Sequence, residues 1–390
     1  MNANGTYTFD ASSYDSLSEG QTQVLTIPVV VTDEQGATAE TTLTITVTGT
    51  NDAPTATAAT GSVTEDASIT GSISAEDVDL PAGASLTFST TSTAAGLTLN
   101  ANGTYTFDAS SYDSLSEGQT QVLTIPVVVT DEQGATAETT LTITVTGTND
   151  APTATAATGS VTEDASITGS ISAEDVDLPA GASLTFSTTS TAAGLTLNAN
   201  GTYTFDASSY DSLSEGQTQV LTIPVVVTDE QGATAETTLT ITVTGTNDAP
   251  TATAATGSVT EDASITGSIS AEDVDLPAGA SLTFSTTSTA AGLTLNANGT
   301  YTFDASSYDS LSEGQTQVLT IPVVVTDEQG ATAETTLTIT VTGTNDAPTA
   351  TAATGSVTED ASITGSISAE DVDLPAGASL TFSTTSTQQA

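Results

Sequence analysis

Acidic side chains gather in short clusters along this sequence, and clustered oxygen donors are the arrangement that binds a hard metal cation. In the stretch 53–150 the clusters are Glu65-Asp66, Glu76-Asp77-Val78-Asp79, Asp113 with Glu117, Asp131-Glu132 and Asn149-Asp150. Carboxylates in contact repel by about 1 kcal/mol per pair even in water. Ca²⁺ offsets such repulsion with about six to eight oxygen ligands, whereas Mg²⁺ demands a tighter octahedron and keeps more water. The clusters therefore favour calcium over magnesium.

The rest of the composition leaves these carboxylates without a charged partner in the chain. The 390 residues include 48 acidic side chains and no Lys, Arg, His or Cys. Without a basic side chain there is no salt bridge for a carboxylate and no basic surface for nucleic acid or anionic lipid. Disulfides, thiolate zinc sites and His or Cys catalysis are excluded as well. The other interpretation of the clusters is a solvated acidic surface that keeps the chain soluble.

The sequence repeats itself with a period of 98 residues. The segment Asn2-Ala3-Asn4-Gly5-Thr6-Tyr7-Thr8-Phe9-Asp10 recurs unchanged from Asn100, Asn198 and Asn296. From Asn2 onward the copies are identical until the tail, where Gln388-Gln389-Ala390 replaces the expected Ala-Ala-Gly. A period near 100 residues suits one β-sandwich domain and is too long for a solenoid unit. Identical copies argue against four specialised sites. They favour a spacer whose useful variable is its length.

Alternation within each copy predicts strands and no helix. Thr42, Thr44, Thr46 and Thr48 interleave with Leu43, Ile45 and Val47, which is typical of a half-buried strand. A second strand places Leu25, Ile27, Val29 and Val31 on one face, and its Pro28 predicts an edge or a bulge. Residues 97–99 and 104–107 flank Asn102-Gly103, a type I′ hairpin signal. With strands near Val63, 69–73 and 86–88, the prediction is an all-β sandwich of about seven strands.

The linkers set the expected domain boundaries. Thr48-Gly49-Thr50-Asn51-Asp52-Ala53-Pro54 follows a completed strand and ends in a stiffening proline. Cutting at each copy gives three whole domains at 53–150, 151–248 and 249–346. Half a domain remains at each end, 1–52 and 347–390. The polar start after Met1 carries no signal peptide, and no stretch approaches the about 18 apolar residues of a membrane span. We therefore expect an excised piece of a longer protein with no direct membrane contact.

Three motifs carry a resemblance to known families. Residues 128–136 (Val-Val-Thr-Asp-Glu-Gln-Gly-Ala-Thr) through 146–152 (Thr-Gly-Thr-Asn-Asp-Ala-Pro) resemble the last two strands and linker of cadherin-like domains. Ser74-Ala75-Glu76-Asp77-Val78-Asp79 resembles their Asp-x-Asp loop. Residues 103–108 (Gly-Thr-Tyr-Thr-Phe-Asp) through 112–115 (Tyr-Asp-Ser-Leu) are similar to the VCBS-type repeats of giant bacterial repeats-in-toxin adhesins. The resemblance covers the whole repeat, and so the whole chain, and it implies a tandem array of cadherin-like or immunoglobulin-like seven-stranded sandwiches.

The resemblance also implies Ca²⁺ between successive domains, at four junctions numbered along the chain. At the first the implied ligands are Asp15, Glu19, Asn51, Asp52, Asp77, Asp79 and Asp131. At the second they are Glu65, Asp113, Glu117, Asn149, Asp150, Asp175, Asp177 and Asp229. At the third they are Glu163, Asp211, Glu215, Asn247, Asp248, Asp273, Asp275 and Asp327. At the fourth they are Glu261, Asp309, Glu313, Asn345, Asp346, Asp371 and Asp373.

Some positions depart from the family pattern. Gly147 and Ala151 stand where the family has acidic residues or Asn, which implies fewer or weaker ions per junction. The first junction lacks its early Glu and the fourth its late Asp, because the half-domains there are incomplete. The match of 113–117 to the acidic mid-domain motif is loose.

The function that this resemblance implies is a calcium-stiffened extender on a bacterial cell surface, projecting the binding region of an adhesin. The alternative is a glycan- or ice-binding module that uses the Thr-rich strand face, with Tyr105 or Tyr112 stacking on a ring. An enzyme is disfavoured, because paired carboxylates hydrolyse glycosides only with one raised pKa in a cleft. Asn4-Gly5-Thr6 matches a glycosylation sequon but is better explained by the hairpin turn.

The expected partners are neighbouring repeats and a second copy of the chain. An unpaired half-sandwich exposes strand edges and a split core. Residues 347–390 of one chain could pair with 1–50 of the next to form a head-to-tail polymer. The alternative is a fragment cut without regard to domain edges.

Overall fold

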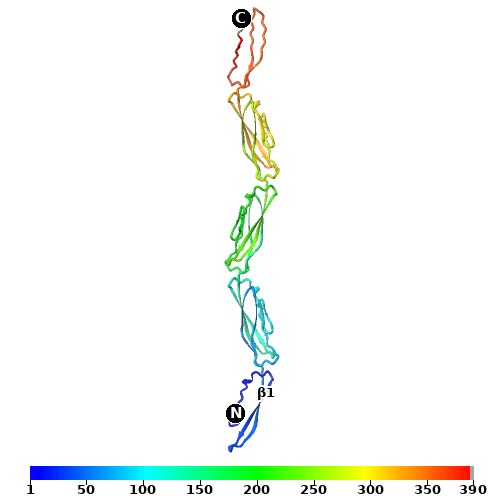
Figure 1. Ribbon diagram of the computed structural model, residues 1–390, viewed down its shortest axis with the longest axis vertical. Coiled ribbons are helices and arrows are strands. Elements are labelled where there is room, and N and C mark those ends of the chain that lie inside the picture. Colours follow the sequence, from blue (N-terminus) through cyan, green and yellow to red (C-terminus); the bar gives the residue numbers. More distant parts are fainter. Residues whose placement is uncertain (387–390) are drawn as a thin grey trace.

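The computed structural model describes residues 1–386 as an extended rod of units set end to end (Figure 1). The amino and carboxyl ends lie at opposite ends of this rod. Within residues 1–386 there is no α-helix, and no helix is long and apolar enough to cross a membrane. We call residues 1–52 the head segment, 53–150, 151–248 and 249–346 the first, second and third sandwiches, and 347–386 the tail segment.

The first sandwich contains all the elements of one repeat. Its strands are β3 (Thr55–Ala56), β4 (Ala59–Thr64), β5 (Ser68–Ser72), β6 (Ala75–Glu76), β7 (Thr87–Ser89), β8 (Leu97–Leu99), β9 (Thr104–Asp108), β10 (Thr120–Thr130) and β11 (Thr136–Thr146). A 3₁₀ turn, η2 (Ser110–Tyr112), follows β9.

The other two sandwiches repeat this order. The second has β12 (Thr153–Ala154), β13 (Ala157–Thr162), β14 (Ser166–Ser170), β15 (Ala173–Glu174), β16 (Thr185–Ser187), β17 (Leu195–Leu197), β18 (Thr202–Asp206), η3 (Ser208–Tyr210), β19 (Thr218–Thr228) and β20 (Thr234–Thr244). The third has β21 (Thr251–Ala252), β22 (Ala255–Thr260), β23 (Ser264–Ser268), β24 (Ala271–Glu272), β25 (Thr283–Ser285), β26 (Leu293–Leu295), β27 (Thr300–Asp304), η4 (Ser306–Tyr308), β28 (Thr316–Thr326) and β29 (Thr332–Thr342).

Two sheets face each other in each sandwich. In the first, the four-stranded sheet has the order β4-β11-β10-β7 and the three-stranded sheet the order β5-β9-β8. The pairing of β4 with β11 is parallel and joins the start of the repeat to its end. These seven strands confirm the predicted all-β fold. The sequence pattern did not predict the extra two-residue pair of β3 with β6.

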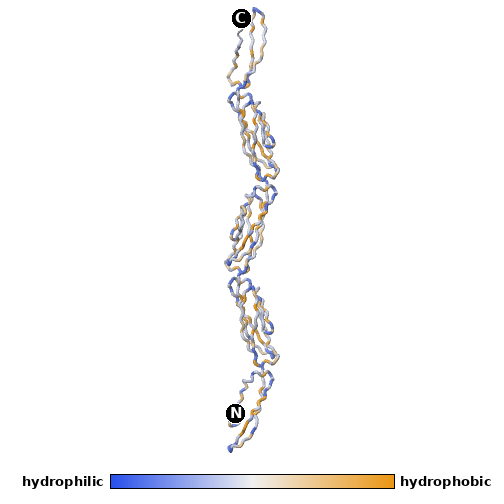
Figure 2. The backbone as a smooth tube through the Cα atoms, viewed as in Figure 1, coloured by the Kyte–Doolittle hydropathy of each residue, from blue (hydrophilic) through white to orange (hydrophobic). Residues whose placement is uncertain are grey.

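The core lies between the sheets and follows the predicted alternation. From Ile125 in β10 and from Leu141 in β11, every second residue is fully buried, while the threonines between them in β11 are half-buried. The fully buried residues of the two strands are Ile125, Val127, Val129, Leu141, Ile143 and Val145. Full burial of such a side chain contributes about 1.5–3 kcal/mol. Figure 2 shows hydrophobic residues recurring along the body of each unit and hydrophilic ones gathered at its ends.

The hairpin at Asn102-Gly103 is present, but its predicted type is wrong. Gly103 has φ of +85°, whereas no positive φ occurs at Asn102, and a type I′ turn needs positive φ at both central residues. The Asn100 amide donates to Thr104 O at 2.8 Å and the Gly103 amide to Asn100 O at 2.9 Å. This is the longer hairpin loop, in which a single left-handed glycine follows an ordinary turn.

The proline in the long strand β10 lies at a position where one side of the strand has no neighbour, which is a local edge of the sheet, as predicted. Pro126 lies in β10 opposite Thr140 of β11, with continuous register and no bulge. On the other side of β10, pairing with β7 covers only Val128–Thr130. The Thr90 hydroxyl donates to Pro126 O at 2.6 Å, so the carbonyl of the proline faces the uncovered side. The missing amide proton of Pro126 therefore costs no ladder bond.

The head and tail segments hold only parts of this fold. The head forms η1 (Ser12–Tyr14) and the hairpin of β1 (Thr22–Thr32) with β2 (Thr38–Thr48). The tail forms the pair of β30 (Thr349–Ala350) with β31 (Ala369–Glu370). The tail residues 353–358, which repeat the sequence of β4, form no strand. Residues 387–390, including the divergent Gln388-Gln389-Ala390, lie outside the described residues.

Candidate metal centres at the junctions

Glu65 is the most deeply buried carboxylate of the second junction. It follows β4 directly, has no exposed surface, and accepts a hydrogen bond at 2.6 Å from the backbone amide of Thr148 in the linker. The second oxygen of this carboxylate, Oε2, is buried without a hydrogen-bond partner. Burial raises the pKa of Glu65, and the negative charges of Asp150 and Asp66 add to the shift.

Asp150 in the linker stands among carboxylates from both neighbouring sandwiches. Burial raises its pKa above the ordinary value. Negative charge raises the pKa further, and it comes from Asp66, Asp177 and Asp113. Asp66 and Asp113 belong to the first sandwich, Asp113 Oδ1 is buried without a partner, and Asp177 belongs to the second sandwich. The junction therefore concentrates negative charge from three parts of the chain.

On the far side of the junction, Asp175 and Asp177 form a close pair of carboxylates. Asp177 is buried, and its amide donates to Asp175 Oδ1 at 3.3 Å. Burial raises the pKa of Asp175 to about 6, and its hydrogen bond with Asp177 and the charges of Asp177 and Asp229 contribute further. Oδ2 of each member is buried without a partner.

Asp229 differs from these residues because it is held as an anion by donors. Its Oδ1 accepts hydrogen bonds from three amides of its own loop, Gln231, Gly232 and Ala233. Its Oδ2 accepts from Asn149 Nδ2 of the linker at 2.8 Å. Burial raises the pKa of Asp229, but these hydrogen bonds outweigh burial and leave the pKa lowered.

Two direct hydrogen bonds tie the sandwiches together at this junction. One is the Asn149–Asp229 bond, and the other runs from the Ser116 hydroxyl to the backbone carbonyl of Asp177 at 2.6 Å. The loop that carries Ser116 also lies against the linker. A Cβ at Gly147 would meet the carbonyl oxygens of Leu115 and Ser116 at 2.3 Å. This close approach explains why glycine stands at a linker position where an acidic residue was expected.

The third junction repeats this arrangement, and the outer two hold parts of it. At the third, the backbone amide of Thr246 donates a hydrogen bond to Glu163 Oε1 at 2.6 Å. Burial raises the pKa of Asp273 to about 6. At the fourth, the backbone amide of Thr344 donates to Glu261 Oε1, and the Ser312 hydroxyl donates to the backbone carbonyl of Asp373. The first junction has the hydrogen bonds to the following sandwich. Asn51 Nδ2 donates to Asp131 Oδ2, and the backbone amide of Asp52 donates to Asp79 Oδ2. The Ser18 hydroxyl donates to the backbone carbonyl of Asp79.

Comparison with known protein families identifies the family to which this architecture belongs. A model of the bacterial cadherin-like domain matches residues 51–147, 149–245 and 247–343, well over half of the chain. The chain belongs to the bacterial cadherin-like domain family. Cadherin-like domains are extracellular adhesion repeats that typically bind Ca²⁺ where two repeats meet.

Solved structures of cadherin extracellular domains are similar to this chain. The extracellular cadherin domains 1–5 of protocadherin gamma B2 match with a TM-score of 0.50 and 17% identity, covering 87% of this chain and 68% of that one. Mouse cadherin-23 EC22–24 matches with a TM-score of 0.46 and 18% identity, covering 76% of this chain and 99% of that one. The comparison with curated proteins finds no match.

The side chains at the junctions of these cadherin-like repeats fit a hard divalent cation. The donor set is entirely oxygen, which is the chemistry that Ca²⁺ prefers. A buried polar atom normally has a hydrogen-bond partner, yet carboxylate oxygens at every junction lack one. These atoms are Glu65 Oε2, Asp79 Oδ1, Asp113 Oδ1, Glu163 Oε2, Asp175 Oδ2, Asp177 Oδ2, Asp211 Oδ1, Glu261 Oε2, Asp275 Oδ1 and Oδ2, Asp309 Oδ1 and Asp371 Oδ1. Within residues 1–386, as the structure places them, no group of three or more acidic side chains is arranged so that it could hold a metal ion.

The structure separates the predicted ligands into two groups. Glu65, Asp113, Asp150 and the Asp175–Asp177 pair of the second junction are brought into one electrostatic cluster, as are their equivalents at the third. At the first junction Asp15 and Asp52 line one hollow. By contrast, Glu117 and its copies are exposed, and no hydrogen bond within residues 1–386 joins them to the clusters. The copies are Glu19, Glu215 and Glu313.

Sequence reasoning missed Asp66 and its copies Asp164 and Asp262 as members of the centre. Asp66 Oδ2 accepts a hydrogen bond from the Thr148 hydroxyl at 3.0 Å, and its charge acts on Asp150. The sequence did hold a signal, because Asp66 is adjacent to Glu65 in an acidic cluster. The roles of Ser116 and Thr148 had no such signal, since neither residue is charged.

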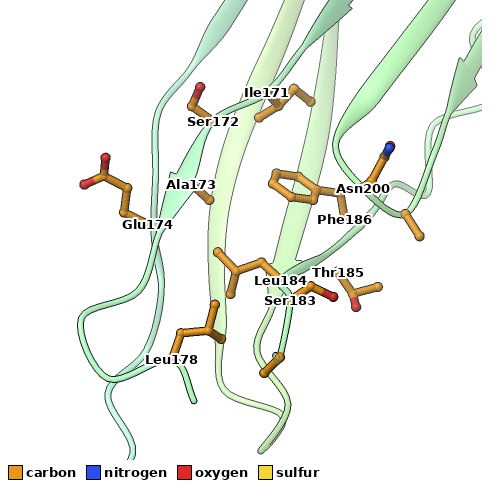
Figure 3. Close-up of a pocket in the computed structure, with 12 residues that line it drawn as sticks. Ile171, Ser172, Ala173, Glu174, Leu178, Ser183, Leu184, Thr185, Phe186 and Asn200 are labelled. Carbon is orange, nitrogen blue, oxygen red and sulfur yellow. The ribbon is translucent and has the colours of Figure 1, made fainter. Parts of the chain in front are cut away.

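The aromatic residues considered for ligand stacking serve the core instead. Tyr105 is buried, and Tyr112 is half-buried with its ring centroid 5.8 Å from that of Phe107. A hollow of about 720 Å³ in the second sandwich is lined by residues such as Ile171, Leu184 and Phe186 (Figure 3). Two of its labelled polar side chains, Glu174 and Asn200, lie at opposite sides of the hollow.

Proposed function

We propose that this chain is a calcium-rigidified extender of a bacterial surface adhesin, which holds a ligand-binding region away from the cell. The observation that carries the proposal is the set of buried, unpartnered carboxylate oxygens on both sides of the second, third and fourth linkers. Membership of the cadherin-like family supports an extracellular adhesion or spacer role. The identity of the copies supports a role in which the number of repeats sets the reach.

The residues of the second junction that would hold calcium come from three places. Glu65, Asp66 and Asp113 would contribute from the first sandwich, Asp150 from the linker, and Asp175, Asp177 and Asp229 from the second sandwich. When bound, the ion supplies two positive charges that no side chain of this chain offers. The Thr148 amide and the loop amides around Asp229 keep Glu65 and Asp229 oriented toward the junction before any ion arrives.

The mechanical consequence follows from the small direct interface between sandwiches. Domains joined by a short linker with few contacts move relative to one another. At the second junction a hydrogen bond from Ser116 and one from Asn149 link the two sides, while the carboxylates repel. An ion ligated from both sandwiches and from Asp150 would replace repulsion by attraction and fix the angle between the units.

The reach follows from strand geometry. Each long strand has 11 residues, which at about 3.3 Å per residue gives a body of roughly 36 Å. Identical sandwiches with identical linkers then add equal increments to the rod, because each junction repeats the same local contacts. Such an array suits a spacer.

Calcium titration by calorimetry on the full chain tests the proposal. We expect heat and stoichiometric binding with Ca²⁺ and weaker binding with Mg²⁺. In the variant D175N/D177N the share of ions bound at the second junction should be lost. The matched control is Glu174→Gln, which removes a charge from an exposed side chain next to Asp175. Absence of calcium binding, or equal loss in the control, would refute the assignment.

Small-angle scattering with and without chelator tests the rigidity separately. We expect the maximum dimension to be largest and best defined in calcium, and the distribution of distances to broaden when the ion is removed. An unchanged distribution in chelator would contradict stiffening even if calcium binds.

A further inference from the structure

The strand that follows the entering linker of each sandwich pairs with the strand that precedes the leaving linker. In the second sandwich all six residues of β13 pair in parallel with Leu239–Thr244 of β20. Apart from the two-residue strand β12, β13 is the first strand of the sandwich, and β20 is the last. The part of the chain that enters the sandwich is therefore joined directly to the part that leaves it.

Stretching the rod pulls these two strands in opposite directions. The sandwiches are set end to end, so that the linkers of one unit lie at its two ends (Figure 1). Because β13 and β20 run parallel, with Thr162 opposite Thr244, tension on the entering linker draws β13 back while tension on the leaving linker draws β20 forward. The hydrogen bonds between the strands lie across this direction. They share the load in shear and must break together, whereas bonds that are peeled apart break one after another.

Hydrogen bonds continue this pairing past the end of β13. The Glu163 amide donates to Thr244 O at 3.1 Å, and the Thr246 amide donates to Glu163 Oε1 at 2.6 Å. On the other side of the leaving chain, the Gly245 amide donates to Gln217 O at 2.8 Å. The leaving chain is thus bonded on both sides before it reaches the next sandwich.

The other strands of the sandwich contribute less to the path of the load. Before β13 the entering chain passes β12, which pairs with β15 over only two residues. The three-stranded sheet β14-β18-β17 is built from the middle of the repeat. Its strands come under tension only after β13 or β20 has moved. The parallel pair is therefore the first extended set of hydrogen bonds that a pull along the rod must break.

We infer that each sandwich is a mechanical clamp through which the rod bears tension, and that the parallel pair of β13 with β20 is the force-bearing element of the second sandwich. The pairs β4 with β11 and β22 with β29 do the same in the first and third. Forced unfolding is governed by the rate of the opening step, so resistance depends on what must break first and not on total stability. Spacing needs only length, whereas bearing tension needs this arrangement of strands.

Single-molecule pulling on the full chain, held by its two ends, measures the force at which each sandwich opens. A sandwich spans 98 residues, and its fully extended chain reaches at most about 320–350 Å, so each opening should lengthen the molecule by about 300 Å. A substitution in the second sandwich alone leaves the first and third as internal standards in the same trace. The measurement is made in chelator, so its result is read independently of calcium binding.

Val161→Pro removes one amide of the clamp. Amides alternate in direction along a strand, so the Val161 amide faces β20, as the Glu163 amide does, whereas the Ser160 amide faces the open edge of the sheet. In V161P one of the three openings should shift to a lower force. S160P adds a proline without removing a pairing amide, and V161A removes the side chain but keeps the amide. Both controls should stay close to the unsubstituted chain.

Leu195→Ala separates the clamp from overall stability. Leu195 lies in β17, pairs with β18 and packs against the core, but it is outside the path of the load. L195A should lower the denaturant midpoint of one sandwich and leave all three opening forces unchanged. This comparison stands even if V161P prevents the second sandwich from folding, because L195A keeps the clamp intact. An unchanged force in a folded V161P, an equal loss in S160P, or a fall in force in L195A that matches its loss of stability would overturn the inference.

Discussion

The interior of a sandwich and the junction between two sandwiches are built from the same repeat but bury opposite kinds of side chain. The interior is apolar and complete in itself, with residues such as Leu239 and Ile241 fully buried among their own strands. The junction buries carboxylates, some of which have oxygens with no partner. Burying a charge is costly unless it is paired or coordinated. The sandwich interior therefore provides stability, whereas burial of like charges makes the junction costly.

The largest expected effect is on the interior. Leu239→Ala deletes a fully buried side chain of β20 and should destabilise the second sandwich by about 2–5 kcal/mol. Denaturant unfolding in chelator should show one sandwich melting earlier than the other two. The control is Val220→Ala at a position that is 59% exposed, which should leave the curve unchanged. A single unshifted transition would mean that the interior is less self-sufficient than its packing indicates.

Local patterns were enough to predict the sandwich interior from the sequence. Alternation at Leu43, Ile45 and Val47 predicts a strand because it has the period of two of a half-buried strand. The burial of Tyr105 was not predictable in this way. In the structure Gly71 lies opposite Tyr105 in register, and any Cβ there would collide with the tyrosine ring. The space for the ring is created by a residue 34 positions earlier in the chain, which periodicity does not reveal.

The junction was predicted in composition but not in detail. The clusters of carboxylates and the family pattern indicated Glu65, Asp150 and Asp177, because charge of one sign without a counter-charge is visible in a sequence. The contribution of Ser116 depends on how two sandwiches meet. Exposure of Glu117, likewise, follows from the path of the loop before β10. Such features depend on tertiary arrangement, which residue types alone do not encode.

We expect pH to have an intermediate effect on folding stability, and this effect arises from the carboxylates of the junctions. Burial raises the pKa of Asp175 and of Asp273 to about 6 from the ordinary 3.8, so the folded chain binds more protons than the unfolded chain between these values. In chelator, stability should therefore rise as the pH falls from about 7 through 6. Well below 3.8 stability should decline again, because the lowered pKa of Asp229 and Asp327 means that protonation there favours unfolding.

Thermal melting in chelator at several pH values checks this sign. The variant D175N/D273N should flatten the rise, whereas E174Q should keep it. In calcium the trend should reverse near pH 6, because protons compete with the metal for the same oxygens. A chelator-treated chain that melts at lower temperature as the pH falls from about 7 to 5 would contradict the arrangement of charges described for the junction.

The smallest expected effect separates the direct contacts of the junction from the effect of the ion. Ser214→Ala removes the hydroxyl that donates to Asp275 O at 2.6 Å across the third junction. A single hydrogen bond contributes about 0.5–1.5 kcal/mol, so the interior of each sandwich should be unaffected while the angle at this junction becomes freer. Small-angle scattering should show a broader distance distribution for S214A in chelator and almost no change in calcium, because an ion ligated from both sides would hold the angle. Ser208→Ala, an exposed serine of η3, is the control and should behave as the unsubstituted chain in both solutions. If S214A loosened the rod equally with and without calcium, the hydroxyl and not the ion would be the element that sets the geometry of the junction.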